Sequence, residues 1–200
     1  MKAKRDVLAF DRWDGMALRF VLWLIVAMGV GANVVQPIVT WVRGGSLSVS
    51  YPGTITVPEL DRVGTAYGNG VYDVVIDDPT PWQRVADLVP GVLMSLLIVW
   101  VVVLLQRVLR HIVAGEQFAA GQVTRLRLVA FLLGLGVPLV FATEFIAGGV
   151  LLGSVDLGGM NIIADVAFPW LMLAAGMVVA LLAEAFKSGA ALRDDVSGLV

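Results

Sequence analysis

Four long apolar runs dominate the chain, and segments rich in charged residues, glycine and proline separate them. Each run holds roughly 18 to 23 residues, and about 20 helical residues cross a hydrocarbon core about 30 Å thick. A bilayer offers no hydrogen-bond partner to free N–H and C=O groups, so each run is expected to be α-helical. The predicted spans are residues 20–42, 88–105, 128–146 and 166–186.

The first run is the least regular, because Asn33, Gln36 and Pro37 interrupt it. A cleaved signal peptide is the alternative, since residues 20–28 are apolar and small residues follow them. The apolar pattern resumes over residues 34–42, which favours a membrane span. Pro37 in this run and Pro138 in the third are expected to bend their helices, because proline has no N–H to donate.

The segment 43–87 differs from the rest of the chain in being rich in glycine, proline and carboxylates. Its alternating stretches predict a small β-rich loop outside the cytoplasm, with a ligand-binding domain as the alternative interpretation. The segment 148–165 is short and rich in glycine, so we expect a connector there. The strand-like stretches are Leu47–Tyr51, Thr54–Val57 and Val71–Ile76, with turn signals at Pro52-Gly53 and Asn69-Gly70.

Composition supports a membrane protein, because 58% of the residues are hydrophobic and only 15% are charged. Soluble domains usually carry about 25% charged residues. The chain has no cysteine, which excludes disulfides, thiolate nucleophiles and zinc sites built on thiolates. The net charge of -2 gives no reason to expect direct binding to nucleic acid. The sequence therefore predicts an all-α membrane protein, with residues 1–200 forming a single membrane domain in the lipid bilayer.

The distribution of lysine and arginine predicts the orientation in the cell membrane. Eleven of these 14 residues flank the runs on the side that holds both termini and the loop 106–127. The remaining three lie in the segment 43–87. Loops rich in lysine and arginine stay in the cytoplasm, so both termini and the loop 106–127 are predicted to be cytoplasmic.

Four polar residues within or near the predicted spans are candidates for a role inside the membrane: Asn33, Gln36, Glu144 and Glu184. Glu144 is expected either to reach the headgroups or to pair with Asn33 or Gln36. Glu184 is expected to pair with Lys187 at the i+3 position. A polar path for a small transporter or channel is the functional alternative to such structural pairing.

We expect neither a catalytic site nor a bound metal or cofactor. The one histidine, His111, is too little for a metal site or a catalytic triad, and an exposed helical position is the simpler interpretation. The sequence offers no plausible nucleophile–base pair or cofactor motif. An enzyme is therefore the poorest of the functional interpretations.

The loop 106–127 carries the most informative pattern. Its arginines and apolar residues predict an interfacial hairpin that contacts anionic headgroups, with a docking surface for a cytoplasmic protein as the alternative. The motif Gly115-Glu116-Gln117-Phe118, followed by Gln122-Val123-Thr124-Arg125-Leu126-Arg127, resembles the DUF2975 family of bacterial membrane proteins. The segment from Leu182 to Asp195 resembles the ending of that family. Gln117 and Gln122 depart from the family pattern, which usually has proline and asparagine there.

The resemblance implies a four-span membrane protein that interacts with a small helix-turn-helix regulator of the Cro/CI type, often encoded beside it. Phe118 and Phe186 would be apolar anchors of the contact surface, with arginines at its rim. A homo-oligomer or an accessory subunit of a larger membrane complex is a further alternative. The partner-binding residues that the resemblance implies are Gly115, Phe118, Arg125, Leu126, Arg127, Phe186, Gly189 and Leu192.

Overall fold

The computed structural model describes residues 12–55, 70–114, 120–153, 155, 160–162 and 168–197. Packing divides the chain into two units, each of which draws on several parts of the sequence. The first unit comprises Met1–Val30, Ser95–Val137 and Trp170–Val200, and the second comprises Gly31–Met94 and Pro138–Pro169.

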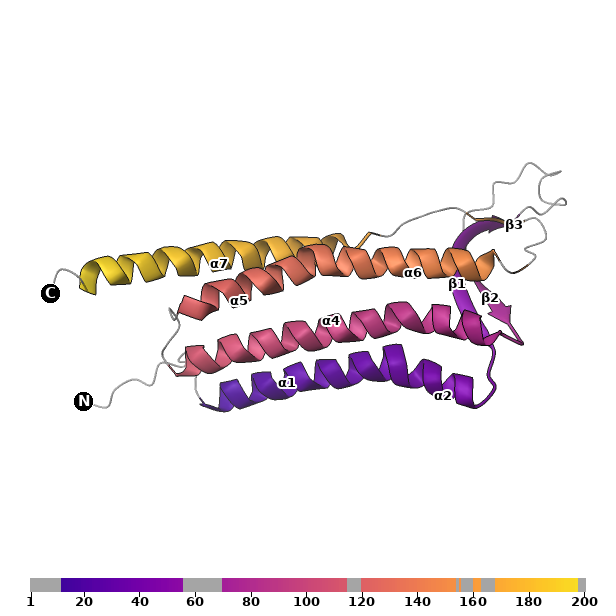
Figure 1. Cartoon of the computed structure of the whole chain (residues 1–200), viewed down its shortest axis with the longest axis horizontal. Helices are drawn as coiled ribbons and strands as arrows, with labels where there is room; N and C mark the ends of the chain where they lie inside the picture. Colours follow the sequence, from indigo (N-terminus) through magenta and orange to yellow (C-terminus); the bar gives the residue numbers. More distant parts are fainter. Residues whose placement is uncertain are drawn as a thin grey trace. The chain divides into compact units, whose positions relative to one another are not determined.

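Four helical segments are long and apolar enough to cross a membrane (Figure 1). They contain 30, 33, 32 and 22 residues. At 1.5 Å per residue these lengths correspond to about 45, 50, 48 and 33 Å, which is enough for a hydrocarbon core of about 30 Å. The four predicted helices are thus confirmed as helices of sufficient length. The segments are Trp13–Val42, Pro81–Val113, Gly121–Leu152 and Trp170–Ala191.

The start of the fourth helix differs from the prediction. It begins at Trp170 rather than at residue 166, and Phe168 and Pro169 lie outside it. A residue that precedes proline is pushed away from the helical conformation by the proline ring. Phe168 is therefore a poor helix residue, and the apolar pattern alone did not reveal this boundary.

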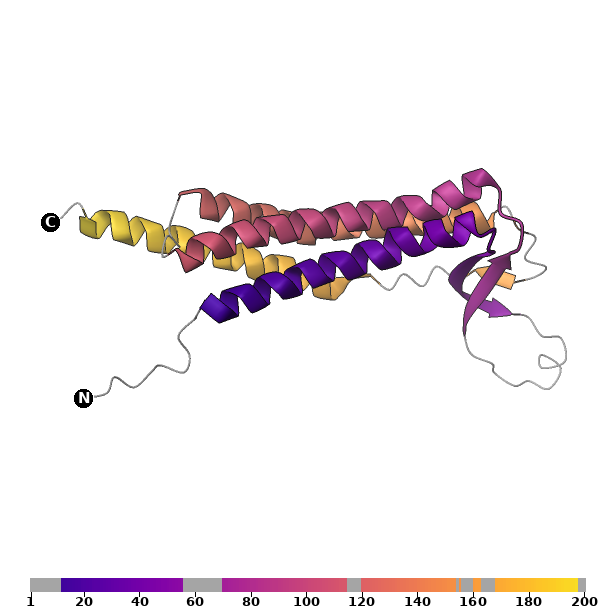
Figure 2. The same cartoon turned by 90° about the horizontal axis from the view of Figure 1, so that it is seen from below.

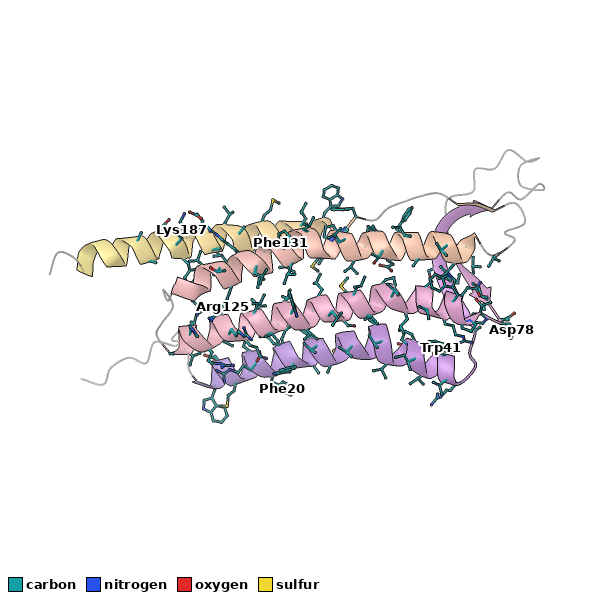
Figure 3. All side chains as sticks on the ribbon, viewed as in Figure 1. Phe20, Trp41, Asp78, Arg125, Phe131 and Lys187 are labelled. Atoms are coloured by element: carbon teal, nitrogen blue, oxygen red, sulfur yellow. The ribbon has the colours of Figure 1, made fainter. Side chains whose placement is uncertain are left out.

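Most of the apolar surface of these helices faces outward. Only 11% to 28% of the most apolar 18-residue stretch of each helix is buried. Large apolar side chains such as Phe20 and Leu181 are 69% and 72% exposed. Figure 3 shows Phe20 directed away from its helix. An apolar surface of this extent requires an apolar environment or a partner to cover it.

Tryptophan is concentrated at the helix ends. Four of the six tryptophans lie within two residues of the end of a long helical segment, namely Trp13, Trp41, Trp82 and Trp170. Their side chains are exposed. This placement is typical of the aromatic belts found at membrane–water interfaces.

The first unit is built from α1 (Arg12–Val30), the latter part of α4 (Pro81–Val113), α5 (Ala120–Phe131), the π-helical turn η2 (Leu132–Gly136) and α7 (Trp170–Ser197). Helices α5 and α7 lie side by side (Figure 1). A small core joins three of these helices, since Val108, Leu126 and Ala183 are buried together. Val179 and Phe186 pack against this core.

Close backbone contact supplements this small core. A Cβ atom built on Gly176 of α7 would lie 2.9 Å from the Gly134 nitrogen and 3.0 Å from the Ala130 oxygen. Only glycine leaves room for this approach. Small residues allow the same kind of backbone packing in membrane helices, where burial from water cannot hold the helices together.

The second unit contains the π-helical turn η1 (Gly31–Val35), α2 (Gln36–Val42), the first turns of α4, α6 (Val137–Leu152) from Pro138 onward, and a sheet. Both predicted bends coincide with π-helical turns, because η1 ends two residues before Pro37 and η2 ends two residues before Pro138. At the second site the Val137 N–H donates to the Leu132 oxygen, five residues back. A π-helical turn shifts the backbone hydrogen bonds by one residue, so the helix can continue past a proline that has no N–H to donate.

The sheet has the strand order β2-β1-β3, with β1 (Leu47–Ile55), β2 (Gly70–Ile76) and β3 (Met160–Ile162). β1 pairs antiparallel with β2 from Leu47↔Ile76 to Gly53↔Gly70 (Figure 2). The predicted turn at Pro52-Gly53 is therefore wrong, and β1 continues through it. β3 pairs with β1 only from Gly53 onward, so among the described strands Pro52 has a neighbour on one side only. Proline is tolerated where one side of the strand is open.

The segment predicted to be a connector contains regular structure. α6 extends to Leu152, and β3 adds a third strand to the sheet. A three-residue strand gives too short an alternation to be distinguished in a segment rich in glycine. The β-rich character predicted for residues 43–87 is confirmed for β1 and β2, whereas the predicted strand residues 56–57 and turn residue Asn69 lie outside the described residues.

Two capping motifs fix the chain around the sheet. α2 ends in a Schellman motif, in which the Gly45 N–H donates to the Thr40 oxygen and the Gly44 N–H donates to the Trp41 oxygen. Gly44 has φ +70°, a conformation that glycine adopts without strain.

The second motif is a capping box at the start of α4. The Thr80 N–H donates to Gln83 Oε1 at 2.7 Å, and the Gln83 N–H donates to Thr80 Oγ1 at 3.4 Å.

We predict that Gly91→Ala destabilises the protein. A Cβ at this position in α4 would lie 2.3 Å from the Asn33 backbone oxygen, so the two backbones would have to separate. Overpacking of this kind typically costs about 1–3 kcal/mol. The midpoint of thermal unfolding in detergent should fall. Gly149→Ala is the matched helical control, because nothing lies within 4 Å of its Cβ. Equal midpoints for the two variants would contradict the close contact.

Candidate functional site

The described partner-binding candidates lie on α5 and α7 of the first unit. Arg125, Leu126 and Arg127 belong to α5, whereas Phe186 and Gly189 belong to α7. Figure 3 labels Arg125 on the first of these helices and Lys187 on the second. Gly115 and Phe118 lie outside the described residues, and Leu192 lies in α7 beyond the part whose side chains are described.

An ion-paired cluster connects the two helices. Arg127 Nη2 donates to Glu184 Oε2 at 2.9 Å, and Lys187 Nζ donates to Glu184 Oε1 at 3.0 Å. Each of the three side chains is more than half exposed. The Glu184–Lys187 pair is the one that the sequence predicts, whereas Arg127 is a second partner from another helix. We call Arg127, Glu184 and Lys187 the α5–α7 cluster.

Leu126 and Phe186 face inward from this surface. Leu126 is buried in the core with Val108 and Ala183, and Phe186 is half-buried against the same core. Their contacts are thus with the protein itself. We expect these two residues to support the surface, while the charged side chains of the α5–α7 cluster remain available for contact.

Arg125 has a partner that the sequence did not reveal. Its Nη1 lies 3.2 Å from His111 Nε2, which connects α5 to the end of α4. Arginine has no acceptor, so the guanidinium donates and the histidine nitrogen accepts. His111 lies on the helical extension that the sequence predicts, but it is half-buried rather than exposed.

A buried amide lies at the start of α5. Gln122 is 1% exposed, and neither its nitrogen nor its oxygen has a hydrogen-bond partner among the residues that the structure describes. A buried polar group without a partner typically costs about 1–3 kcal/mol. Gln122 belongs to the sequence motif of the loop, but nothing in its local pattern indicated that it would be buried.

The polar residues of the predicted spans do not form one group. Glu144 is exposed on α6, and within the described ranges it has no hydrogen bond or ion pair with Asn33 or Gln36. Asn33 lies in η1, where its backbone oxygen faces Gly91. Gln36 is exposed at the start of α2. The predicted pairing of Glu144 with an amide is not present in the structure.

Comparison of this chain with protein-family models, with curated proteins and with solved structures found no match. The resemblance to the DUF2975 family therefore rests on the sequence motifs alone.

The division between the inner and outer sides of α7 leads to a prediction about two adjacent residues. Ala183 is 0% exposed, so Ala183→Leu should force α4, α5 and α7 apart and lower stability by about 1–3 kcal/mol. Glu184→Gln should change stability little, because exposed ion pairs contribute little to folding. Thermal unfolding in detergent measures both effects. A larger loss for Glu184→Gln than for Ala183→Leu would contradict this division.

Proposed function

We propose that this chain is a multi-pass protein of the cell membrane that acts by binding a cytoplasmic protein and catalyses no reaction itself. The α5–α7 cluster is the observation that carries the proposal. It joins Arg127, from the loop motif, to Glu184 and Lys187, from the second motif, through ion pairs of 2.9 and 3.0 Å. The two segments that the resemblance singles out thus contribute to one exposed surface.

Insertion into a membrane is supported by the outward-facing apolar side chains. Leu171 and Leu181, for example, are 77% and 72% exposed on the fourth long helix. Contact with lipid would remove this surface from water, and the tryptophans at the helix ends would lie at the headgroups. The lengths of the four helical segments suit this arrangement.

The cytoplasmic location of the cluster is supported by the distribution of basic residues. Eleven of the 14 lysines and arginines flank the spans on the side of the termini and the loop 106–127. Arg127 and Lys187 are two of these eleven. On this orientation the α5–α7 cluster faces the cytoplasm.

The chemistry of the surface suits a protein partner with an acidic contact region. Arg127 and Lys187 share a single carboxylate, that of Glu184, so the cluster retains a net positive charge. A small helix-turn-helix regulator, as the resemblance implies, is the partner we propose. Complementary charge would orient it against the membrane protein.

The orientation can be tested by cysteine labelling, because the natural chain has no cysteine. Asp78→Cys and Ala114→Cys each place a single thiol at an exposed position, one before α4 and one after it. In intact cells a membrane-impermeant maleimide should label the first variant and not the second. Both variants should react after the cells are permeabilised. Labelling of Ala114→Cys in intact cells would overturn the proposed orientation.

Partner binding can be tested by co-expression with the adjacent helix-turn-helix regulator that the resemblance predicts, followed by co-purification in detergent. The double variant Arg127→Ala with Lys187→Ala should lower recovery of the regulator at least tenfold, because it removes both positive charges of the cluster. Its thermal midpoint should stay close to that of the natural chain, since these ion pairs are exposed.

Arg43→Ala is the matched control, since it removes an exposed positive charge just after α2, in the segment predicted to lie outside the cytoplasm. Co-purification should be unchanged in this variant. If the natural chain does not retain the regulator, or if the double variant retains it fully, the proposed surface is wrong.

A further inference from the structure

A cavity of about 330 Å³ lies in the second unit, where α2, the start of β1 and the first turns of α4 meet. Its volume falls at the lower end of the range of small-molecule sites, about 300–1,000 Å³. The lining is unusually polar for a chain of this composition. The residues that matter for its chemistry are Gln36, Trp41, Ser46, Ser48, Arg84 and Asp87.

The walls of this cavity are fixed by hydrogen bonds. Arg84 Nη2 donates to the Gly45 oxygen at 3.0 Å. Gly45 ends the Schellman motif of α2, and Arg84 follows the Thr80–Gln83 capping box of α4. A Cβ on Gly45 would lie 2.7 Å from Thr40 Cγ2 and 3.2 Å from the Thr40 backbone oxygen, so a larger residue there would displace Thr40. Two capped helix ends, joined by one arginine, thus hold the polar lining in place.

The two charged groups of the lining do not neutralise each other. Arg84 and Asp87 are three residues apart on α4, but no ion pair within 4.0 Å joins them. Asp87 is half-buried and has neither a hydrogen bond nor an ion pair with any residue in the described part of the chain. A partly buried carboxylate without a partner is unfavourable, because burial removes some of its water.

The charges restrict what can bind. A simple cation at Asp87 would be repelled by the Arg84 guanidinium three residues away, and a simple anion at Arg84 would be repelled by Asp87. A molecule that carries both an ammonium and an anionic group can satisfy both side chains together. The hydroxyls of Ser46 and Ser48 and the amide of Gln36 supply further hydrogen bonds to either group.

We propose that this cavity binds a small zwitterion, with its ammonium at Asp87 and its phosphate or carboxylate at Arg84. Phosphoethanolamine has this chemistry, both as the headgroup of phosphatidylethanolamine and as a free molecule. The cavity belongs to the second unit, whereas the α5–α7 cluster belongs to the first, so the two proposals stand on different residues. On the proposed orientation the cavity opens on the outer side of the membrane.

Binding can be measured on the full chain purified in detergent, with two probes that separate the sources of the zwitterion. Native mass spectrometry would detect retained phosphatidylethanolamine, with phosphatidylglycerol as the comparison lipid that lacks an amine. Calorimetric titration would detect free O-phosphoethanolamine. Asp87→Asn should weaken binding of the amine-containing probe at least tenfold, because it removes the negative charge that holds the ammonium. Asp78→Asn is the matched control, since Asp78 is exposed and does not line the cavity.

Retention of the lipid alone would identify the headgroup as the ligand, and binding of the free molecule alone would identify a soluble zwitterion. Ser46→Phe, which fills the cavity and leaves both charges in place, should abolish binding and serves as a second variant if Asp87→Asn does not fold. The proposal is overturned if neither probe binds, if phosphatidylglycerol binds equally well, or if Asp87→Asn binds as well as Asp78→Asn. None of these outcomes depends on whether a regulator binds the α5–α7 cluster.

Discussion

The rest of this structure depends on one constraint: the apolar side chains that point outward from the long helices must be covered. Phe20, Leu171 and Leu181 are largely exposed, whereas the described core that joins α4, α5 and α7 consists of three buried side chains with Val179 and Phe186 packed against them. Burial from water inside the protein is therefore too limited to hold such long helices together. If lipid covers the outer surface, the hydrophobic effect gives no preference for one helix pairing over another, and other interactions must determine it.

Close backbone contact at the π-helical turns provides such an interaction. Pro37 and Pro138 each follow a π-helical turn, and each turn is contacted by a glycine from another helix. Gly91 approaches η1, and Gly176 approaches η2. At the first site the contacted atom is the Asn33 oxygen, the acceptor that Pro37 would have reached in a regular α-helix if it had an N–H. A side chain on Gly91 would separate the helices where the backbone is least regular. The bends and the helix contacts are thus one structural feature.

The sequence predicted the features that depend on local pattern and missed those that depend on contacts between distant residues. Four helices follow from long apolar runs, and the Glu184–Lys187 pair follows from its spacing along one helix. The Arg127–Glu184 pair joins residues 57 positions apart, so no spacing rule predicts it. The capping box at Thr80 is different, because threonine, proline and glutamine at these positions were a local signal that could have been found.

The strand β1 shows why local signals also mislead. Pro52-Gly53 is a strong turn signal, but the pairing of β1 with β2 continues through it. The reason lies in β3, which follows more than 100 positions later and pairs only from Gly53 onward. Among the described strands Pro52 has a neighbour on one side only, and proline is tolerated where one side of a strand is open. Tertiary context thus decides whether this dipeptide turns the chain.

Most of the charged side chains discussed above have a structural partner within the protein, but Asp87 differs from them. Glu184 is shared by two cations, Arg125 reaches His111, and Arg84 holds the Gly45 carbonyl, so each of these side chains has a structural partner. Asp87 has none in the described part of the chain, although it is half-buried in a cavity whose walls are fixed by two capped helix ends. A carboxylate in this position adds no contact to the fold and is unfavourable there unless something else binds it. Among the described residues, the fold therefore leaves the Asp87 carboxylate in this cavity without a partner, which is the observation behind the proposed zwitterion site.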